Sequence, residues 1–358
     1  MGGRIEAVAP WQPAGPPVTY DLARYTVLPG LIDAHVHIAG YFNRLGQINR
    51  SGDGETGRQQ AAGVAANALA TLRAGFTTVA SMGAWGDRAL RESIRRGKLP
   101  GPRILTSLDP IRDSSLSLGD LETLVRHHAR DHADFIKIFE SNSVMAGGTP
   151  TFSVEQLTLM CHQARALGLR TVVHAQSDAS LKVAAAAGCD EIEHGILATE
   201  AGLKLLAERG IYFDPQCGLI LRNYLEHRNA YRGIRGFDSA AMSYMNDLLP
   251  SLPKVTRMAL GIPGLKLLYG TDATAGAHGR NAEDLICRVR EAGQSPMDAL
   301  VTATSRNASA LGLGNQVGTI GPGYQADLIA TDGNPVEEIE AVLRVRFVMK
   351  DGTVFLAP

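Results

Sequence analysis

The sequence predicts an α/β fold: a (β/α)8 TIM barrel with a small β-sandwich domain formed by both ends of the chain. Short β-rich segments alternate with Ala-, Leu- and Arg-rich helical segments. Strand is followed by helix eight times over about 250 residues, the count expected for such a barrel. At both chain ends the pattern changes to short strands interrupted by glycine.

The eight expected barrel strands begin after a Pro-Gly turn at Pro29-Gly30. They are residues 31–37, 76–80, 103–106, 135–139, 170–174, 191–194, 211–213 and 265–269. Helical patterns lie between most of them and after the last one, at 59–73, 121–132, 154–167, 201–209, 281–292 and 296–311. A doubly wound open sheet is the alternative, but no Gly-x-Gly-x-x-Gly follows the first strand.

The two chain ends are expected to form one composite domain. Their strand-like pieces are residues 4–8, 25–28, 318–330 and 345–355. We therefore expect residues 1–27 and 312–358 to form the small β-sandwich and residues 28–311 to form the barrel.

Composition excludes several classes of function. The chain has 358 residues, of which 45% are apolar, and its 35 basic residues nearly balance 36 acidic ones, so nothing indicates nucleic acid or an anionic membrane as a partner. No stretch resembles a signal peptide or a membrane span. The four cysteines are widely spaced with no Cys-x-x-Cys, which favours reduced thiols in a cytoplasmic protein.

The first expected strand ends in His35-Val36-His37. Side chains alternate between the faces of a strand, so the two histidines point the same way, about 7 Å apart, and can share a metal ion. Alone, such a pair is more often incidental than metal-binding. The rest of the chain strengthens it, since active sites of barrels lie at the C-terminal ends of the strands. The polar residues expected there are His35, His37, Lys137, His174, His194 and Asp272.

Each of these residues has a simpler explanation when taken alone, such as a hydrogen-bonded core histidine or, for Asp272, a helix cap. Lys137 is the most informative, because it lies in the apolar run Phe135-Ile-Lys-Ile-Phe139. A buried lysine is costly unless its charge is paired or removed. Either it forms a salt bridge with a nearby carboxylate, or carbon dioxide converts the amine into a carbamate that bridges two divalent metals.

The combined motifs resemble the metal-dependent amidohydrolase superfamily. They are His35-Val36-His37 after Pro-Gly-Leu-Ile-Asp, Lys137 in Ile-Lys-Ile, His174, Glu193-His194-Gly195, Gly270-Thr271-Asp272, and the run from Ala303-Thr304 to Ala326-Asp327-Leu328. The match covers nearly the whole chain. Within the superfamily, the chain is most similar to the Xaa-Pro dipeptidase (prolidase)-like and imidazolonepropionase-related hydrolases.

The resemblance implies two divalent metal ions, with zinc as the default. Their ligands would be His35, His37 and Asp272 for the more buried ion, His174 and His194 for the more exposed one, and carboxylated Lys137 between them. The resemblance further implies that a hydroxide shared by the metals attacks a carbonyl carbon. Asp272 would accept its proton and pass it to the leaving nitrogen.

The expected reaction is hydrolysis of an amide bond in a small molecule, a dipeptide or an N-acyl amino acid. Deaminases of the superfamily place a glutamate soon after the fifth-strand histidine, whereas this chain has His174-Ala-Gln-Ser177. The alternatives are a one-metal cyclic-amide or urea-type hydrolase similar to imidazolonepropionase, a deaminase, and a scaffold without activity. We also expect a homo-oligomer.

Substrate selection should lie in the loops after the strands. The candidates are Tyr41, Phe42, Arg44, Gln216, Arg222, Tyr224 and His278. An arginine among them would clamp a substrate carboxylate, and the aromatic residues would form an apolar wall. Exposed loop arginines and packed aromatic residues without any role in binding are equally consistent with the sequence. Glu193 is expected to orient a metal ligand from behind.

Overall fold

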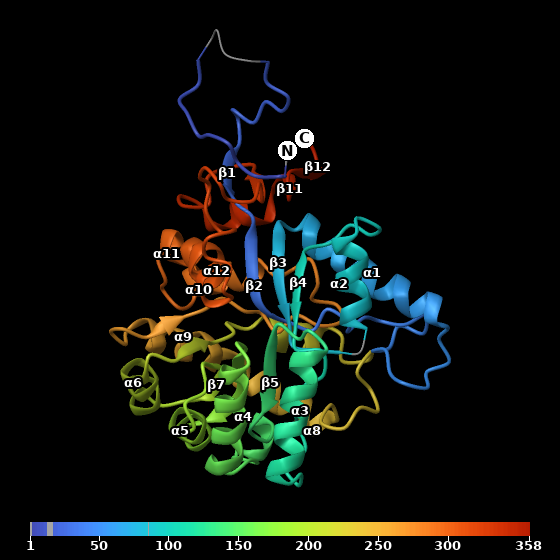
Figure 1. Cartoon of the computed structure of the whole chain (residues 1–358), viewed down its shortest axis with the longest axis vertical. Coiled ribbons are helices and arrows are strands. Elements are labelled where there is room, and N and C mark those ends of the chain that lie inside the picture. The colour runs from blue at the N-terminus through green and yellow to red at the C-terminus, as the bar shows by residue number, and fades with distance from the viewer. Residues whose placement is uncertain (1, 13–16, 85) are drawn as a thin grey trace.

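The central strands form two parallel sheets in this computed structural model, which describes residues 2–12, 17–84 and 86–358. One sheet has the order β2-β3-β4 and the other β5-β6-β7-β8-β9. Their bounds are β2 (Leu31–Val36), β3 (Phe76–Ser81), β4 (Arg103–Thr106), β5 (Phe135–Phe139), β6 (Arg170–Ser177), β7 (Glu191–Leu197), β8 (Tyr212–Asp214) and β9 (Lys266–Leu267). All eight strands expected from the sequence are therefore present. Helices alternate with these strands along the chain, so the α/β class is confirmed (Figure 1).

Two single parallel bridges connect the sheets. Ile111, beyond β4, pairs with Ile138 of β5, and Val36 of β2 pairs with Ala273 beyond β9. The amide of His37 also donates to the carbonyl of Ala273 at 2.7 Å. The end of β2 therefore lies against the segment that follows β9.

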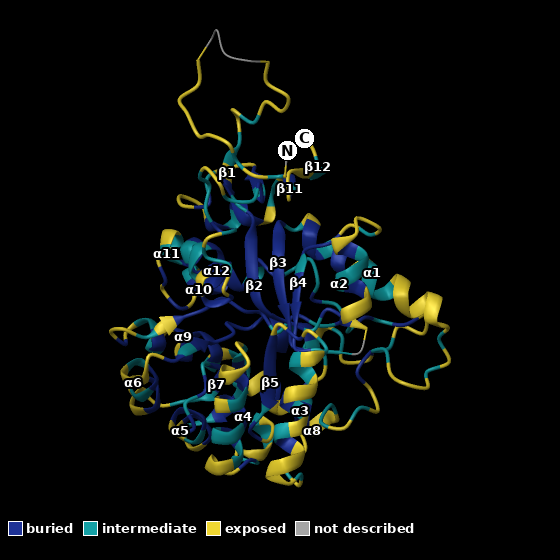
Figure 2. Cartoon of the chain, viewed as in Figure 1, coloured by how far each residue is buried: buried dark blue, intermediate teal, exposed yellow. Residues whose placement is uncertain are grey.

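The strands are buried and the helices cover them (Figure 2). Every residue of β2 and β3 is buried, as expected for parallel strands covered on both faces. The helices are α1 (Gly57–Arg73), α2 (Asp87–Arg95), α3 (Leu118–Arg130), α4 (Val154–Ala166), α5 (Asp178–Ala186), α6 (Glu200–Arg209), α7 (Leu219–Glu226), α8 (Ser239–Leu248), α9 (Leu252–Leu260), α10 (Glu283–Arg290), α11 (Pro296–Val301) and α12 (Asn307–Ala310). Several begin with a side-chain cap, and α1 and α4 begin with complete capping boxes at Thr56 and Ser153.

The helix expected over residues 296–311 is interrupted by a π-helical turn at Thr302–Arg306. The hydroxyls of Thr302 and Thr304 donate to carbonyls four residues earlier, at 2.7 and 2.6 Å. The side chain of Asn307 donates to the carbonyls of Ile32 and Tyr269, at 2.9 and 2.7 Å. The irregular turn thus comes just before a side chain that links β2 to the segment after β9.

Both chain ends contribute to one four-stranded antiparallel sheet. Its order is β1 (Thr26–Pro29), β10 (Leu328–Thr331), β11 (Val345–Lys350) and β12 (Thr353–Leu356). The strand expected at residues 4–8 is reduced to a single bridge between Arg4 and Gln325. Since β1 ends at Pro29 and β2 begins at Leu31, this sheet continues directly into the parallel one.

The four cysteines form two disulfide bonds, so the prediction of reduced thiols was wrong. Cys161 of α4 is bonded to Cys189, and Cys217 is bonded to Cys287 of α10, with Cα atoms 5.2 and 5.8 Å apart. The partners are 28 and 70 residues apart in sequence, and only the packing of helices against strands brings them together. Because disulfides persist mainly in oxidising compartments, the argument for a cytoplasmic protein no longer holds.

None of the described helices is long and apolar enough to cross a membrane.

Candidate metal centre

Four histidines converge at the C-terminal ends of the strands. His35 lies in β2 and His37 directly follows it, while His174 lies in β6 and His194 in β7. The ring centroid of His35 lies 5.6 Å from that of His37 and 5.1 Å from that of His194. The ring centroids of His174 and His194 are 4.5 Å apart. Residues 159 positions apart in sequence thus form one cluster of imidazoles.

Asp272 completes this cluster from the segment after β9. Its Oδ1 atom lies 3.2 Å from Nε2 of His35 and 3.1 Å from Nε2 of His37. The three donor atoms lie within 4.8 Å of one another, and the buried Nε2 of His35 has no hydrogen-bond partner among the described residues. A divalent cation would satisfy that atom, so the residues present fit a metal ion.

The protonation states suit metal binding. Burial lowers the pKa of His174 to about 3 and the pKa of His37 below its ordinary value, which keeps both imidazoles neutral. Burial alone would raise the pKa of Asp272, but the adjacent His35 and His37 hold it well below its usual range. His37 and His174 are therefore neutral imidazoles near the Asp272 carboxylate, and these are the forms that bind a cation.

Two of these residues have a left-handed backbone. His194 has a φ of 70° and Asp272 a φ of 56°. Such a conformation costs about 1–3 kcal/mol and is kept only where surrounding contacts enforce it. At Asp272 the enforcing contact is a backbone hydrogen bond, in which the amide of Asp272 donates to the carbonyl of His35 at 2.8 Å.

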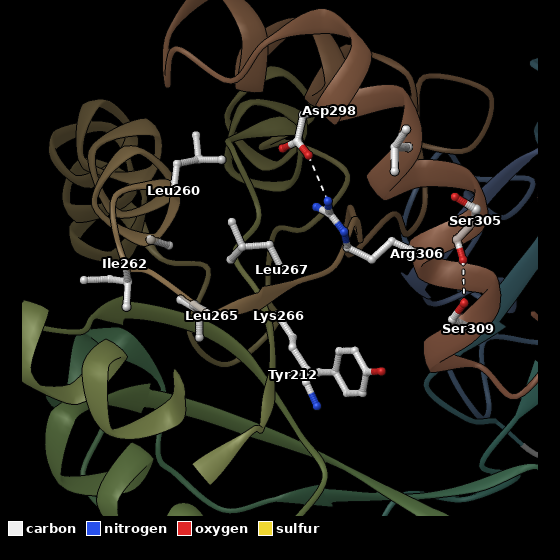
Figure 3. A pocket seen from close by; sticks show the side chains of 13 residues that line it. Tyr212, Leu260, Ile262, Leu265, Lys266, Leu267, Asp298, Ser305, Arg306 and Ser309 are labelled. Carbon is white, nitrogen blue, oxygen red and sulfur yellow. Dashed lines mark hydrogen bonds and ion pairs between the residues drawn. The ribbon is translucent and has the colours of Figure 1, made fainter. Parts of the chain in front are cut away.

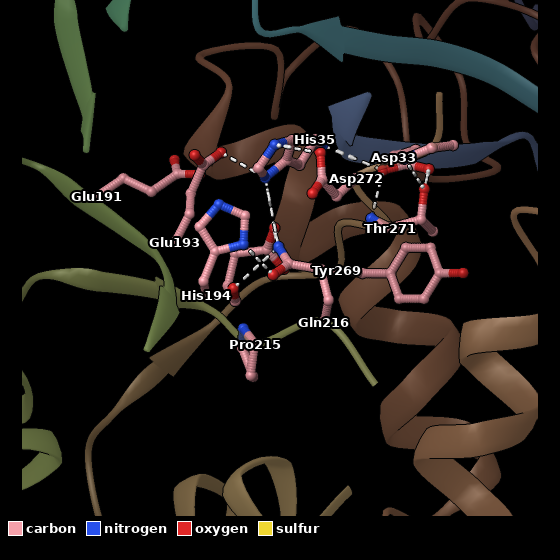
Figure 4. A network of polar contacts seen from close by, with 12 residues as sticks. Asp33, His35, Glu191, Glu193, His194, Pro215, Gln216, Tyr269, Thr271 and Asp272 are labelled. Atoms are coloured by element: carbon pink, nitrogen blue, oxygen red, sulfur yellow. Dashed lines mark hydrogen bonds and ion pairs between the residues drawn. The ribbon is translucent and has the colours of Figure 1, made fainter. Parts of the chain in front are cut away.

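Asp33 anchors the segment that carries Asp272 (Figure 4). Its carboxylate accepts hydrogen bonds from the hydroxyl and the amide of Thr271, at 2.6 and 3.1 Å, and from the side chain of Asn281, at 2.7 Å. Burial raises the pKa of Asp33 to about 6. In the sequence, Asp33 is only one residue of a motif. Its hydrogen-bond partners lie 238 and 248 residues away, so the local pattern does not predict them.

Glu193 and Gln216 hold the two buried imidazoles from behind (Figure 4). Oε1 of Glu193 lies 2.9 Å from Nδ1 of His35, and Nδ1 of His194 donates to Oε1 of Gln216 at 2.7 Å. Both contacts leave Nε2 directed to the other side. Gln216 also donates to the carboxylate of Asp214 at 3.1 Å, so a chain of polar contacts fixes His194.

Lys137 is fully buried in β5 and contacts the carboxylate of Glu193. Burial lowers the pKa of its amine to about 7. The unmodified side chain therefore has a carboxylate partner, as the salt-bridge explanation for a buried lysine requires. Lys137 lines one cavity of about 620 Å³ together with all four histidines and Asp272.

Only some of the substrate-binding candidates line the cavity that holds the metal-ligand candidates. Gln216 and Tyr224 line this cavity, whereas Tyr41, Phe42, Arg44, Arg222 and His278 do not. Tyr41 donates its hydroxyl to Glu55 at 2.5 Å, and Arg44 is exposed.

Arg222 and His278 are held by other contacts. Arg222 lies 3.5 Å from the buried carboxylate of Asp284, because residues 219–226 form helix α7 and not the loop assumed from the sequence. Nε2 of His278 lies 3.2 Å from the carbonyl oxygen of His37, so its ring contacts backbone.

A second hollow of similar size, shown in Figure 3, has none of the four histidines in its lining. It has a volume of about 650 Å³ and is lined by Tyr212 and Lys266, the first residues of β8 and β9, together with the Asp298–Arg306 ion pair. It thus lies toward the N-terminal ends of the strands, and none of the metal-ligand candidates line it. The metal-ligand candidates line the other cavity.

Comparison with known proteins gives consistent matches. The model of the Amidohydrolase family matches residues 26–355. Ochratoxinase from Aspergillus niger is 26% identical over 381 aligned residues, covering 93% of this chain and 76% of that protein. A crystal structure of a Xaa-Pro dipeptidase with methionine bound in its active site has a TM-score of 0.86 and 28% identity, covering 100% of this chain and 94% of that one. A crystal structure of an amidohydrolase has a TM-score of 0.84 and 25% identity, with 100% and 93% covered.

Proposed function

Because the chain belongs to the Amidohydrolase family, as its motifs suggested, we propose that it is a metal-dependent hydrolase that cleaves the amide bond of a dipeptide or an N-acyl amino acid. The observation that carries this proposal is the convergence of four imidazoles and the Asp272 carboxylate on one cavity. Similarity to a Xaa-Pro dipeptidase, described with an amino acid in its active site, supports a substrate of this class.

The proposed metal site uses the residues named from the motifs. His35, His37 and Asp272 would hold one divalent cation, and His174 and His194 a second. Nitrogen and oxygen donors of this kind favour zinc. When bound, the cations supply Lewis acidity, which polarises a carbonyl oxygen and makes water acidic near neutral pH.

The residues of the chain supply orientation and proton transfer. Glu193 and Gln216 fix the Nδ1 atoms of His35 and His194, so the Nε2 atoms stay available for the cations. The Asp272 carboxylate, kept ionised by the neighbouring imidazoles, accepts a proton from the attacking water and delivers it to the departing nitrogen.

Lys137 is proposed to become carboxylated and to bridge the two cations. Its neutral amine would add to carbon dioxide, forming a carbon–nitrogen bond and releasing one proton, which gives an anionic carbamate with two oxygen ligands. Complete burial supports this step, because burial disfavours the charged amine. The ion pair with Glu193 is the competing arrangement.

A Lys137→Ala variant separates these arrangements. If the carbamate is a ligand, the variant loses one of two bound metals, and short carboxylic acids restore metal content and activity. If Lys137 only neutralises Glu193, metal content is unchanged and the acids have no effect. An unmodified amine in a crystal of the metal-loaded protein would contradict the carbamate directly.

The proposal extends to the architecture around the site. The two parallel sheets, linked by the bridges at Ile111 and Val36, would close as the (β/α)8 barrel of residues 28–311. Residues 1–27 and 312–358 would form the small domain, with the antiparallel sheet as one layer of a sandwich. A homo-oligomer is also part of this proposal, and light scattering of the purified protein tests it.

Elemental analysis combined with a substrate panel tests the function. Two metal ions per chain and hydrolysis of dipeptides or N-acyl amino acids are expected. One metal with activity on lactams or aryl ureas would instead favour the cyclic-amide or urea-type hydrolase. Release of ammonia from purines would favour a deaminase, and protein without bound metal after purification in the absence of chelators would favour a scaffold.

A further inference from the structure

The cavity that holds the metal-ligand candidates has one strongly apolar wall. This wall consists of Met145, Ile196, Ile220, Leu221, Phe237 and Met245. Ile220, Leu221 and Met245 are buried members of one hydrophobic cluster, and the other three pack against it. The wall is therefore a built surface that favours an apolar group of substrate.

Arg235 lines the same cavity. Its guanidinium makes no ion pair or hydrogen bond with the described residues, whereas Arg222, the candidate from the sequence, is paired with Asp284. Phe237, two residues further on, stacks on Tyr231 with ring centroids 5.0 Å apart and lies 4.9 Å from Tyr224. These aromatic contacts hold the segment that carries Arg235, an exposed residue, beside the apolar wall.

A smaller hollow adjoins this cavity and shares part of its lining. It has a volume of about 390 Å³, and His37 and Tyr224 line both hollows. The rest of its lining includes small residues, among them Gly40, Gly83 and Ala84. A substrate held at the imidazoles would thus have two unequal hollows for its two halves, a large apolar one lined by Arg235 and a compact one beside His37.

From this asymmetry we infer that Arg235 is a specificity-determining residue that binds the free carboxylate of a bulky, apolar leaving amino acid. The inference rests on the proposed function, because in a dipeptide or N-acyl amino acid the carboxylate belongs to the half that leaves as the amine. That half occupies the apolar hollow, and the acyl group occupies the smaller hollow beside His37. A charged hydrogen bond of this kind changes affinity about 10- to 100-fold.

The test compares L-phenylalanine with L-phenylalaninamide as ligands of the metal-loaded protein, by calorimetry. The wild-type protein should bind the acid at least about tenfold more tightly than the amide, and glycine more weakly than phenylalanine. Arg235→Gln should remove the preference for the acid, and Arg235→Lys should retain part of it. The matched control is Arg232→Gln, because Arg232 lies on the same segment but lines a different hollow.

Kinetics with N-acetyl-L-phenylalanine and its carboxamide provide a second readout. In Arg235→Gln the KM of the acid should rise about tenfold or more while kcat and the turnover of the carboxamide stay unchanged. A preference for the acid that survives in Arg235→Gln, or that is absent in the wild-type protein, overturns the inference. Selective binding that depends on Arg235 without hydrolysis of any amide overturns the proposed function and leaves the carboxylate site standing.

Discussion

Replacing Gln216 with leucine should weaken zinc binding about 10- to 100-fold, which corresponds to about 1.4–2.7 kcal/mol. Gln216 is 4% exposed, and its amide oxygen accepts from Nδ1 of His194 at 2.7 Å while its nitrogen donates to Asp214 at 3.1 Å. Leucine fills a similar volume without a polar atom. The His194 ring therefore loses the partner that fixes its tautomer and orientation.

The same substitution should destabilise the metal-free protein. It leaves Nδ1 of His194 and a carboxylate oxygen of Asp214 without this partner in a buried site, and an unsatisfied buried group costs about 1–3 kcal/mol. Competition with a chromophoric chelator measures the zinc affinity, and urea unfolding in the presence of EDTA measures the stability.

Gln176→Leu is the matched control. Gln176 lines the same cavity and is 5% exposed, but its Oε1 atom has no hydrogen-bond partner among the described residues. This variant should bind zinc as tightly as the wild-type protein. If Gln216→Leu does so as well while keeping a native circular dichroism spectrum, the positioning role of Gln216 is refuted.

Three further predictions concern residues outside the set of metal-ligand candidates. Burial raises the pKa of Glu140 from 4.5 to about 9, so the folded state holds this proton more tightly and loses stability as the pH rises between these values. Glu140→Gln should therefore show a smaller fall in Tm between about pH 5 and 8 than the wild-type protein, and equal falls would contradict this reasoning. The Cys161–Cys189 and Cys217–Cys287 disulfides close loops of 28 and 70 residues, worth about 3.6 and 4.4 kcal/mol of chain entropy. Replacing both members of the first pair with alanine should lower the free energy of unfolding by about 2–4 kcal/mol, and free thiols in unreduced, unfolded wild-type protein would refute the pairing. Arg222→Gln should lower stability by about 1–3 kcal/mol through the loss of its contact with Asp284 but leave KM unchanged, and a raised KM for carboxylate substrates would restore the role expected from the sequence.

The sequence alone was sufficient to predict the strands and to group the metal-ligand candidates at one end of them. Whether a segment forms a strand depends largely on its local pattern. Each of the eight short apolar runs forms a parallel strand in the structure. The cluster followed from one geometric rule, because polar side chains at the C-terminal ends of parallel strands meet at the same end of the fold. For this reason His35, His174 and Asp272 could be grouped before any distance was known.

The contacts behind the cluster depended on tertiary structure. Nothing in the local pattern of Gln216 distinguishes a residue that contacts substrate from one that holds His194. Glu193 was expected to orient a metal ligand, but the sequence did not show that its partners are His35 and Lys137. These contacts join residues between 22 and 158 positions apart. Their geometry is set by how neighbouring strands are aligned, which periodicity does not specify.

The substrate-facing surface and the disulfides were also decided by packing. Residues 219–226 fold as helix α7, so Arg222 turns to Asp284, while Arg235 from the following segment lines the cavity. The cysteine pairs likewise depend on which helix lies against which strand. The residues at the ends of the strands could thus be named in advance, because strand formation and face alternation are local properties. The side chains that surround them became known only from the fold, because those neighbours are brought together by the packing of distant segments.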